Sequence, residues 1–293
     1  MGIYDGKDVT SASRRRPWGS LGLPCIGVAA AALLISCGSP AAPGAKPAPV
    51  AALPKPSLPP WIASISPIAS ADNLAQIRVV FATPVTAVQA LSGAGPTEVL
   101  SHVSIAPALR GHFTVLTPRM IGFVAEQALP IGTRVRVTLS AGLRDLAGDA
   151  LARDLSWTFE TAPLSFTNLP QTEASDDEAT PGPVGLSPKL QVTANAAVDE
   201  SSLASHVSLV GGNDNVLVTA TLETQPTPYP GTGAEERFDP SLSTWVYDLR
   251  PTGDLRRGTK YVLAIAPGVE PAYGNVVTTQ RFTGAIRTFG ALA

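Results

Sequence analysis

The chain has 293 residues, of which 44% are hydrophobic, 15% charged and 6% aromatic, and its formal net charge is −2. At this length, that composition supports packed cores in about two domains and excludes a largely disordered chain. Without residues 1–36, which carry four basic and two acidic side chains, the net charge becomes −4. We therefore expect no nucleic-acid partner, because such proteins present a basic surface.

The first 36 residues have the pattern of an export signal. Arg14, Arg15 and Arg16 precede the apolar segment LGLPCIGVAAAALLIS, which contains two glycines and a proline. The segment has about 16 residues, which is short for a membrane-spanning helix and typical of the apolar part of a signal peptide. The arginines also suggest a twin-arginine signal, but Pro17 and Trp18 fit that pattern poorly.

The apolar segment ends in Leu34, Ile35, Ser36 and Cys37, which together resemble a bacterial lipobox. The resemblance implies that the thiol of Cys37 receives a diacylglycerol, that a signal peptidase cuts before it, and that a further acyl chain such as palmitate is added. Two or three acyl chains anchor a protein stably where one would not. The alternative is an ordinary buried or free cysteine after an uncleaved helix.

The segment from Cys37 to residue 60 is rich in proline and alanine and has no core-forming periodicity. Such a segment favours extended polyproline II, so we expect a stalk reaching about 70 Å at roughly 3.1 Å per residue. A tether without fixed length would serve the same purpose. Cys25 and Cys37 are the only cysteines, so we expect no disulfide and no thiolate metal site in the remainder of the chain.

The remainder of the chain contains an internal repeat. SHVSI (101–105) recurs as SHVSL (205–209), and GTRVRVTLSAGL (132–143) corresponds to GTKYVLAIAPGV (258–269). At the front of the two units, the residues around Phe81 match those around Ala194. The number of residues that separates matching positions differs from one matched segment to the next. This difference predicts about nine extra residues in the first unit and about 22 in the second, at surface loops.

Alternation with period 2 characterises the repeated segments. Val135, Val137 and Leu139 alternate with polar residues, as an antiparallel strand with one buried face requires. Many short strands separated by glycine, proline and aspartate predict an all-β fold of two tandem immunoglobulin-like sandwiches. We read residues 143–155 as a turn followed by a strand rather than as a helix. The expected boundaries are 1–36 for the signal, 37–60 for the linker, and 61–163 and 164–293 for the two domains.

One set of residues in the first unit resembles the surface-layer-protein type of bacterial Ig-like domain. The set comprises Phe81, Pro84, Val85, Leu129, Pro130, Gly132, Thr133, Gly142, Leu143, Asp145, Gly148, Trp157, Phe159 and Thr161. Two such units behind a lipobox and a proline-rich stalk resemble the N-terminal region of bacterial alpha-2-macroglobulin-like lipoproteins. The resemblance covers residues 60–293.

That family implies a periplasmic protease trap, in which a thioester formed from a Cys-x-x-Gln motif captures the attacker in many members. No cysteine follows Cys37, so we do not transfer the trapping chemistry to this chain. We expect either the anchoring and spacing portion of such a protein, truncated or split, or a stand-alone surface module that binds a protein or glycan. The expected partners are the membrane, through the lipid, and envelope proteins or proteases. The expected location is the bacterial envelope, at the outer membrane.

Sequence motifs for catalysis are missing, and a hydrolase with an unrecognised site is kept only for comparison. His102 and His206 occupy equivalent repeat positions, which favours structural roles on matching strands, and His112 is assigned to the surface. The acidic residues Asp176, Asp177 and Glu178 fit a solvated loop better than a Ca²⁺ site. Residues 233–245, with Phe238 and Trp245, fit a long hairpin better than a partner-binding loop. We expect no catalytic residue, metal or cofactor.

Overall fold

The computed structural model describes residues 46–72, 75–90, 95–171, 182–224 and 244–290. Strands dominate these ranges, and the two α-helices within them are seven residues each, α1 (Gly95–Ser101) and α2 (Glu200–His206). The expected all-β, immunoglobulin-like fold class is confirmed. Residues 143–155 form a turn closed by a bridge between Arg144 and Ala150, and a strand begins at Leu155, as expected.

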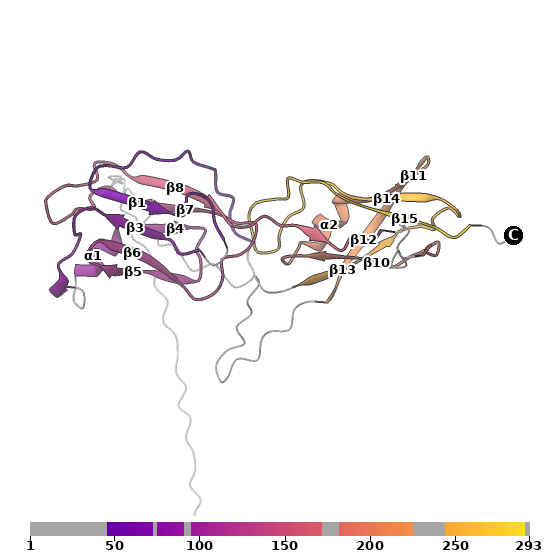
Figure 1. The fold of residues 1–293 in the computed structure, drawn as a ribbon, viewed down its shortest axis with the longest axis horizontal. Coiled ribbons are helices and arrows are strands. Elements are labelled where there is room, and N and C mark those ends of the chain that lie inside the picture. Colours follow the sequence, from indigo (N-terminus) through magenta and orange to yellow (C-terminus); the bar gives the residue numbers. More distant parts are fainter. Residues whose placement is uncertain (1–45, 73–74, 91–94, 172–181, 225–243, 291–293) are drawn as a thin grey trace, which may run out of the picture. The chain divides into compact units, whose positions relative to one another are not determined.

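The first set of strands, which we call the first lobe, comprises two four-stranded sheets (Figure 1). Their orders are β1-β3-β6-β5 and β2-β8-β7-β4. The bounds are β1 (Ile62–Ser66), β2 (Ala69–Ser70), β3 (Arg78–Phe81), β4 (Val103–Ala106), β5 (Gly111–Thr117), β6 (Met120–Ala125), β7 (Arg134–Leu139) and β8 (Leu155–Glu160), with a 3₁₀ turn at Val88–Ala90.

The second set of strands, the second lobe, forms one sheet with the order β15-β14-β11-β12-β13-β10-β9. The long strand β12 pairs with β11 near its start and with β13 further along, so it joins two halves of a sandwich. The bounds are β9 (Phe166–Thr167), β10 (Leu190–Ala194), β11 (Val207–Gly211), β12 (Asp214–Thr224), β13 (Trp245–Pro251), β14 (Lys260–Ile265) and β15 (Phe282–Arg287).

The two lobes use the same strand order. In the first, β3 lies between β1 and β6; in the second, β10 lies between β9 and β13. Likewise β7 lies between β4 and β8, and β14 lies between β11 and β15. The repeated segment that begins at Gly132 thus contains β7, and its counterpart from Gly258 contains β14. The lobes differ where β11 pairs with β12, because β4 and β5 share no ladder.

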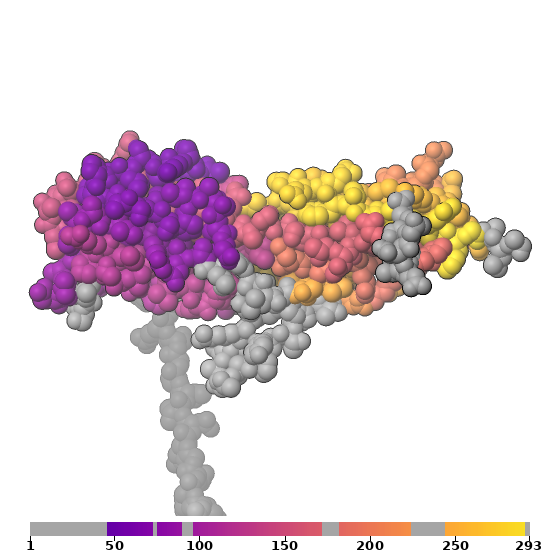
Figure 2. Space-filling view, viewed as in Figure 1, coloured from indigo at the N-terminus to yellow at the C-terminus, as the bar shows by residue number. Residues whose placement is uncertain are grey.

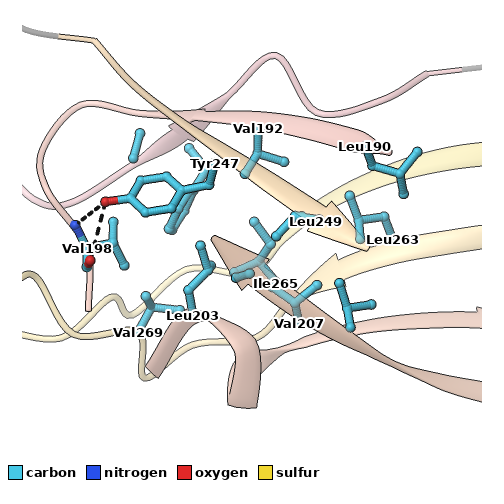
Figure 3. Packing of buried hydrophobic residues seen from close by; sticks show 14 of the residues in the cluster. Leu190, Val192, Val198, Leu203, Val207, Tyr247, Leu249, Leu263, Ile265 and Val269 are labelled. Carbon is cyan, nitrogen blue, oxygen red and sulfur yellow. Dashed lines mark hydrogen bonds between the residues drawn. The ribbon is translucent and has the colours of Figure 1, made fainter. Parts of the chain in front are cut away.

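Each lobe has its own hydrophobic core. Val135, Val137 and Leu139 on β7 are fully buried, as their alternation predicts, and they pack with Trp157 of β8. Trp157 also satisfies its indole N–H through the carbonyl of Pro67, at 3.1 Å. The second core collects Leu190, Val192, Leu203, Val207, Tyr247, Leu249, Leu263, Ile265 and Val269 from strands, α2 and the β14–β15 loop (Figure 3).

Candidate functional site

The predicted lipidation site lies outside the described residues. Cys37 and the lipobox residues Leu34, Ile35 and Ser36 all precede residue 46, and so does the whole predicted signal. Within the described ranges, no helix combines the length and the apolar character needed to cross a bilayer. The anchor therefore stays a prediction from sequence.

The described part of the predicted stalk lies against the first lobe. The main-chain N–H of Leu53 donates to Thr158 Oγ1 on β8 at 2.9 Å, and Leu58 packs against the first core. In Figure 1 the indigo trace of these residues runs alongside β8. From the sequence we expect a spacer free of the lobe up to residue 60, whereas contacts with residues far away in the sequence attach Val50, Leu53 and Leu58 to the first lobe.

The three histidines have separate local environments. His102 Nδ1 lies 3.0 Å from Ser140 Oγ, and His206 Nδ1 donates to the carbonyl of Ser202 at 2.7 Å. His112 is exposed on β5. His102 directly follows α1, and His206 is the last residue of α2. Their equivalent placement in the two repeats is therefore confirmed, but the expected position on strands is wrong. The reason is that SHVSI and SHVSL each span the end of a short helix and the start of a strand.

Each of the two repeat-related histidines also packs on a glycine from the repeated GL or GV turn. A Cβ added to Gly142 would lie 3.3 Å from the ring of His102, and one added to Gly268 would lie 2.5 Å from His206 Nε2. Both glycines have positive φ angles, which side chains rarely adopt. The imidazoles therefore fill space above these turns, which is a structural use of histidine.

In both repeats a threonine caps the Gly-Thr turn. This threonine directly follows the last strand, β8 in the first lobe and β15 in the second. Thr161 Oγ1 accepts the N–H of Thr133 at 2.9 Å and donates to Pro130 O at 2.7 Å. Thr288 Oγ1 accepts the N–H of Thr259 at 3.0 Å in the second lobe and donates to Arg256 O at 2.5 Å. The motif threonine thus satisfies buried main-chain groups.

Asp145, another motif residue, organises the turn that follows β7. Its Oδ1 accepts the N–H groups of Ala147 and Asp149 at 3.0 and 2.9 Å, and its Oδ2 accepts the hydroxyl of Thr83. These hydrogen bonds, that of Thr83 foremost, hold the pKa of Asp145 below its usual value. The carboxylate of Asp145 is thus held ionised by local donors and shapes this loop.

A charged cluster lies on the outer face of the second lobe. Lys189 Nζ lies 2.9 Å from Asp248 Oδ2 and also contacts Glu223. The hydrogen bond to Glu223, followed by that to Asp248, raises the pKa of Lys189. Burial raises the pKa of Asp248, but the hydrogen bonds from Lys189 and Gln191 outweigh it and the net pKa is lowered. Lys189 and Asp248 are therefore both charged at neutral pH and neutralise each other in part.

Two surface depressions are present in the described part of the chain. One, of about 320 Å³, is lined by residues 75–78 at the entry to β3, by Leu116 of β5, and by residues 122–125 of β6 and 127–129 beyond it. The other, of about 610 Å³, lies between Pro56–Pro59 and Ala150–Ser156. In the second, Asp154 accepts the N–H of Ala141 and Ser156 bonds to Thr138, so these two side chains are engaged in the fold. Among the described residues, no three His, Cys, Asp or Glu side chains are placed to hold a metal ion.

Most of the other predicted candidates lie outside the described residues. Asp176, Asp177 and Glu178 all belong to the undescribed range 172–181, and most of the insertion between β12 and β13 belongs to the undescribed range 225–243. Of that insertion's aromatic pair, Phe238 is not described. Trp245 is buried as the first residue of β13, so it belongs to the second core rather than to a surface loop.

Comparison with known proteins gives one family and one long relative. The family described as bacterial Ig-like domain matches residues 57–161. The chain is 42% identical over 253 residues to the "Alpha-2-macroglobulin homolog" of Nostoc sp. (strain PCC 7120 / SAG 25.82 / UTEX 2576). The match covers 85% of this chain but 13% of that protein, so the chain spans about an eighth of the relative's length.

Solved structures with some likeness include two mycobacterial L,D-transpeptidases. The enzyme from Mycobacterium smegmatis is 11% identical with a TM-score of 0.25, over 67% of this chain and 77% of that one. The enzyme from Mycobacterium tuberculosis H37Rv is 15% identical with a TM-score of 0.26, over 66% and 76%. Likeness at this level supports no argument about fold or function. By the family match, residues 57–161 are similar to bacterial Ig-like domains, and most of the chain is similar to a short part of an alpha-2-macroglobulin homolog.

Proposed function

We propose that this chain is a non-catalytic, lipid-anchored envelope protein that provides the anchoring and spacing part of an alpha-2-macroglobulin-like protease-defence system. The observation that carries the proposal is the 42% identity over 253 residues to a short part of a macroglobulin homolog. A match of this length covers both lobes and not only the Ig-like unit at residues 57–161. The chain therefore shares more with that relative than a common domain type.

The anchoring part of the proposal rests on Cys37. It follows an apolar segment with a basic start, and its three preceding residues fit a lipobox. Acylation would place two or three hydrocarbon chains on this residue, and each buried methylene contributes about 0.8 kcal/mol to membrane binding. The lobes would then stay at the membrane surface without any membrane-spanning segment of their own.

The non-catalytic part of the proposal is supported by how polar side chains are used. Thr161, Thr288 and Asp145 satisfy main-chain groups of loops, and His102 and His206 pack on turn glycines. The sulfur atoms available for thioester chemistry are those of Cys25 and Cys37, both in or next to the signal. We therefore assign no covalent capture step to this chain.

Metabolic labelling with a palmitate analogue in a bacterial host tests the anchor. We expect wild-type protein and Cys25→Ser to incorporate the label and partition into the detergent phase, because Cys25 is removed with the signal. Cys37→Ser should lose both properties. Incorporation that survives in Cys37→Ser, or a wild-type protein that partitions into the aqueous phase, would refute the lipid anchor.

A protease-binding assay tests the spacing role. Purified full-length chain is incubated with a protease, and the products are separated on denaturing and native gels. We expect no covalent conjugate between the chain and the protease, and we expect the protease to keep its activity toward a protein substrate. A conjugate, or inhibition by the chain alone, would show that the chain itself performs the defence chemistry and would overturn its assignment as a spacer.

A further inference from the structure

Residues 46–53, which we call the strap, are attached to the first lobe through their carbonyl groups. Arg134 Nη1 donates to Val50 O at 3.0 Å, and Arg136 Nη2 donates to Ala51 O at 3.4 Å. Thr158 Oγ1, which accepts the Leu53 N–H, lies 3.4 Å from Leu53 O. Pro47 and Pro49 have no N–H to give to a ladder, so side chains of β7 and β8 take the place of a neighbouring strand.

The strap also reaches the second lobe. Asn275, in the loop between β14 and β15, donates through Nδ2 to the carbonyl of Ala48 at 3.0 Å. Lys46 forms an ion pair with Glu270 of the same loop. Exposed ion pairs contribute little to stability, so the hydrogen bond of Asn275 is the more specific contact.

The same loop attaches directly to the first lobe. The N–H groups of Asn275 and Val276 both donate to Gly132 O, at 3.0 and 2.8 Å. The Asn275 side chain accepts the N–H of Arg134 at 2.7 Å and donates to Arg134 O at 3.1 Å. Asn275 therefore bonds to the strap, to β7 and to the turn before β7.

Close backbone approach and a buried side chain complete the junction. A Cβ on Gly274 would collide with the carbonyl oxygens of Gly132 and Ile131. The side chain of Ile131 is buried and belongs to the second core, although Ile131 precedes β7 of the first lobe. Hydrogen bonds, backbone contact and apolar packing thus act at one place, where a mobile linker would leave main-chain groups exposed to water.

We propose that the strap and the Asn275 loop form a clamp that holds the two lobes in one fixed relation. Domains joined by short linkers move relative to each other by default unless their interface is extensive. Here the clamp offers several hydrogen bonds to main-chain groups in addition to the packing of Ile131. The strap gains a second role, because it transmits a pull on the N-terminal segment to the junction.

Distances between two spin labels test the clamp. The labels are attached at Ala147→Cys in the first lobe and Asn213→Cys in the second, both exposed loop positions. The full chain carries Cys25→Ser and Cys37→Ser, so that labelling is unambiguous and the result does not depend on the lipid anchor. We expect one narrow distance distribution. A broad distribution in this background would overturn the clamp.

Matched variants identify the contacts responsible. Gly274→Ala adds a Cβ that collides with the carbonyl oxygens of the first lobe at the junction. Its control is Gly253→Ala, whose added Cβ has no atom within 4 Å. Asn275→Ala removes the polar contacts, and its control is Gln280→Ala, which removes an exposed amide from the same loop. We expect the first of each pair to broaden the distribution at least twofold and the controls to leave it unchanged. Unchanged distributions in both test variants would refute the proposal.

The strap is tested separately with a single spin label at Ala51→Cys. We expect an immobilised spectrum in the parent protein and a mobile one when Thr158→Val removes the hydrogen bonds to Leu53. Thr158→Val keeps the shape and β propensity of the residue, so β8 should stay intact, and circular dichroism checks this. A mobile label in the parent protein would mean that the strap is free and would overturn its part in the clamp.

Discussion

The side chain of Asn275 bonds to both main-chain polar groups of Arg134, accepting its N–H at 2.7 Å and donating to its carbonyl at 3.1 Å. β4, which pairs with β7, ends at Ala106 opposite Arg136, and Pro107 follows. The strand therefore stops short of Arg134, and the amide of Asn275 replaces the missing β partner. An amide can do so because it carries a donor and an acceptor with the geometry of a peptide group.

The side chain of Tyr247 on β13 also bonds to main-chain groups from another part of the chain. Its hydroxyl accepts the N–H of Val198 at 2.7 Å and lies 3.3 Å from Val198 O, at the corner that leads into α2 (Figure 3). Tyr247→Phe leaves these main-chain groups buried without a partner. We expect unfolding free energy to fall by about 1–3 kcal/mol, measured by urea denaturation at pH 7. Tyr273→Phe, at a half-exposed position, should change it by less than about 0.5 kcal/mol.

Tyr247 also predicts the response to alkaline pH. Burial raises its pKa to about 12, whereas an unfolded tyrosine ionises near its ordinary value of 10.0. As pH rises from 10 to 12, the unfolded chain loses its proton first, so stability falls in this window. We expect wild type to lose stability more steeply there than Tyr247→Phe, by roughly 2–3 kcal/mol in total. Parallel curves for the two proteins would contradict this.

Asp199 begins α2 as its N-cap. Its Oδ1 accepts the N–H of Ser202 at 2.8 Å and the hydroxyl of Ser201 at 2.5 Å. We expect Asp199→Ala to lower the unfolding free energy by about 1 kcal/mol and Asp199→Asn, which can still cap, to cost less. The hydrogen bond from Ser201 is the main cause that lowers the pKa of Asp199. The wild-type advantage over Asp199→Asn is therefore present at neutral pH and disappears as pH falls through that lowered pKa. An advantage that persists in acid would be inconsistent with this assignment.

Gly268 carries the packing of His206 on the turn after β14. Its φ of +111° disfavours any side chain, and a Cβ would lie 2.5 Å from the imidazole Nε2. Gly148 has a similar φ of +98° but no atom within 4 Å of the same position. Gly148→Ala therefore measures backbone strain alone, about 1–2 kcal/mol, and Gly268→Ala measures strain and collision together. We expect Gly268→Ala to have the lower thermal midpoint of the two; equal midpoints would mean that the histidine moves freely.

The clamp changes how far an anchored chain could stand from its membrane. If Cys37 is acylated, nine residue steps separate it from Lys46, and they span at most about 32 Å when fully extended. A free stalk up to residue 60 could reach about 70 Å. In proteoliposomes, a donor dye on Ala147→Cys of the first lobe should transfer more energy to acceptor lipids in the parent protein than in Thr158→Val, which releases the strap. Equal transfer in the two proteins would refute attachment of the strap.

Much of the fold could be predicted from the sequence because apolar and polar residues alternate with period 2. Val135, Val137 and Leu139 alternate with polar residues, and the structure buries all three. Turn residues such as Gly132 and Gly142 have the positive φ angles that glycine permits. Figure 2 shows the atoms of the first lobe in indigo to magenta and those of the second lobe in pink to yellow. The α-helices α1 and α2 went unpredicted, because seven residues are too few for a helical period to show.

The amino-acid sequence by itself determined the fold class, the repeated order of apolar strands and the candidate anchor at Cys37, because these depend on residue spacing along the chain. Only the tertiary structure decided where the proline-rich segment lies and what Asn275 does. Leu53 and Thr158 are 105 residues apart, and Asn275 and Ala48 are 227 apart. Their contacts exist because β8, the strap and the β14–β15 loop are brought together by packing, and no local pattern of residues encodes such a meeting.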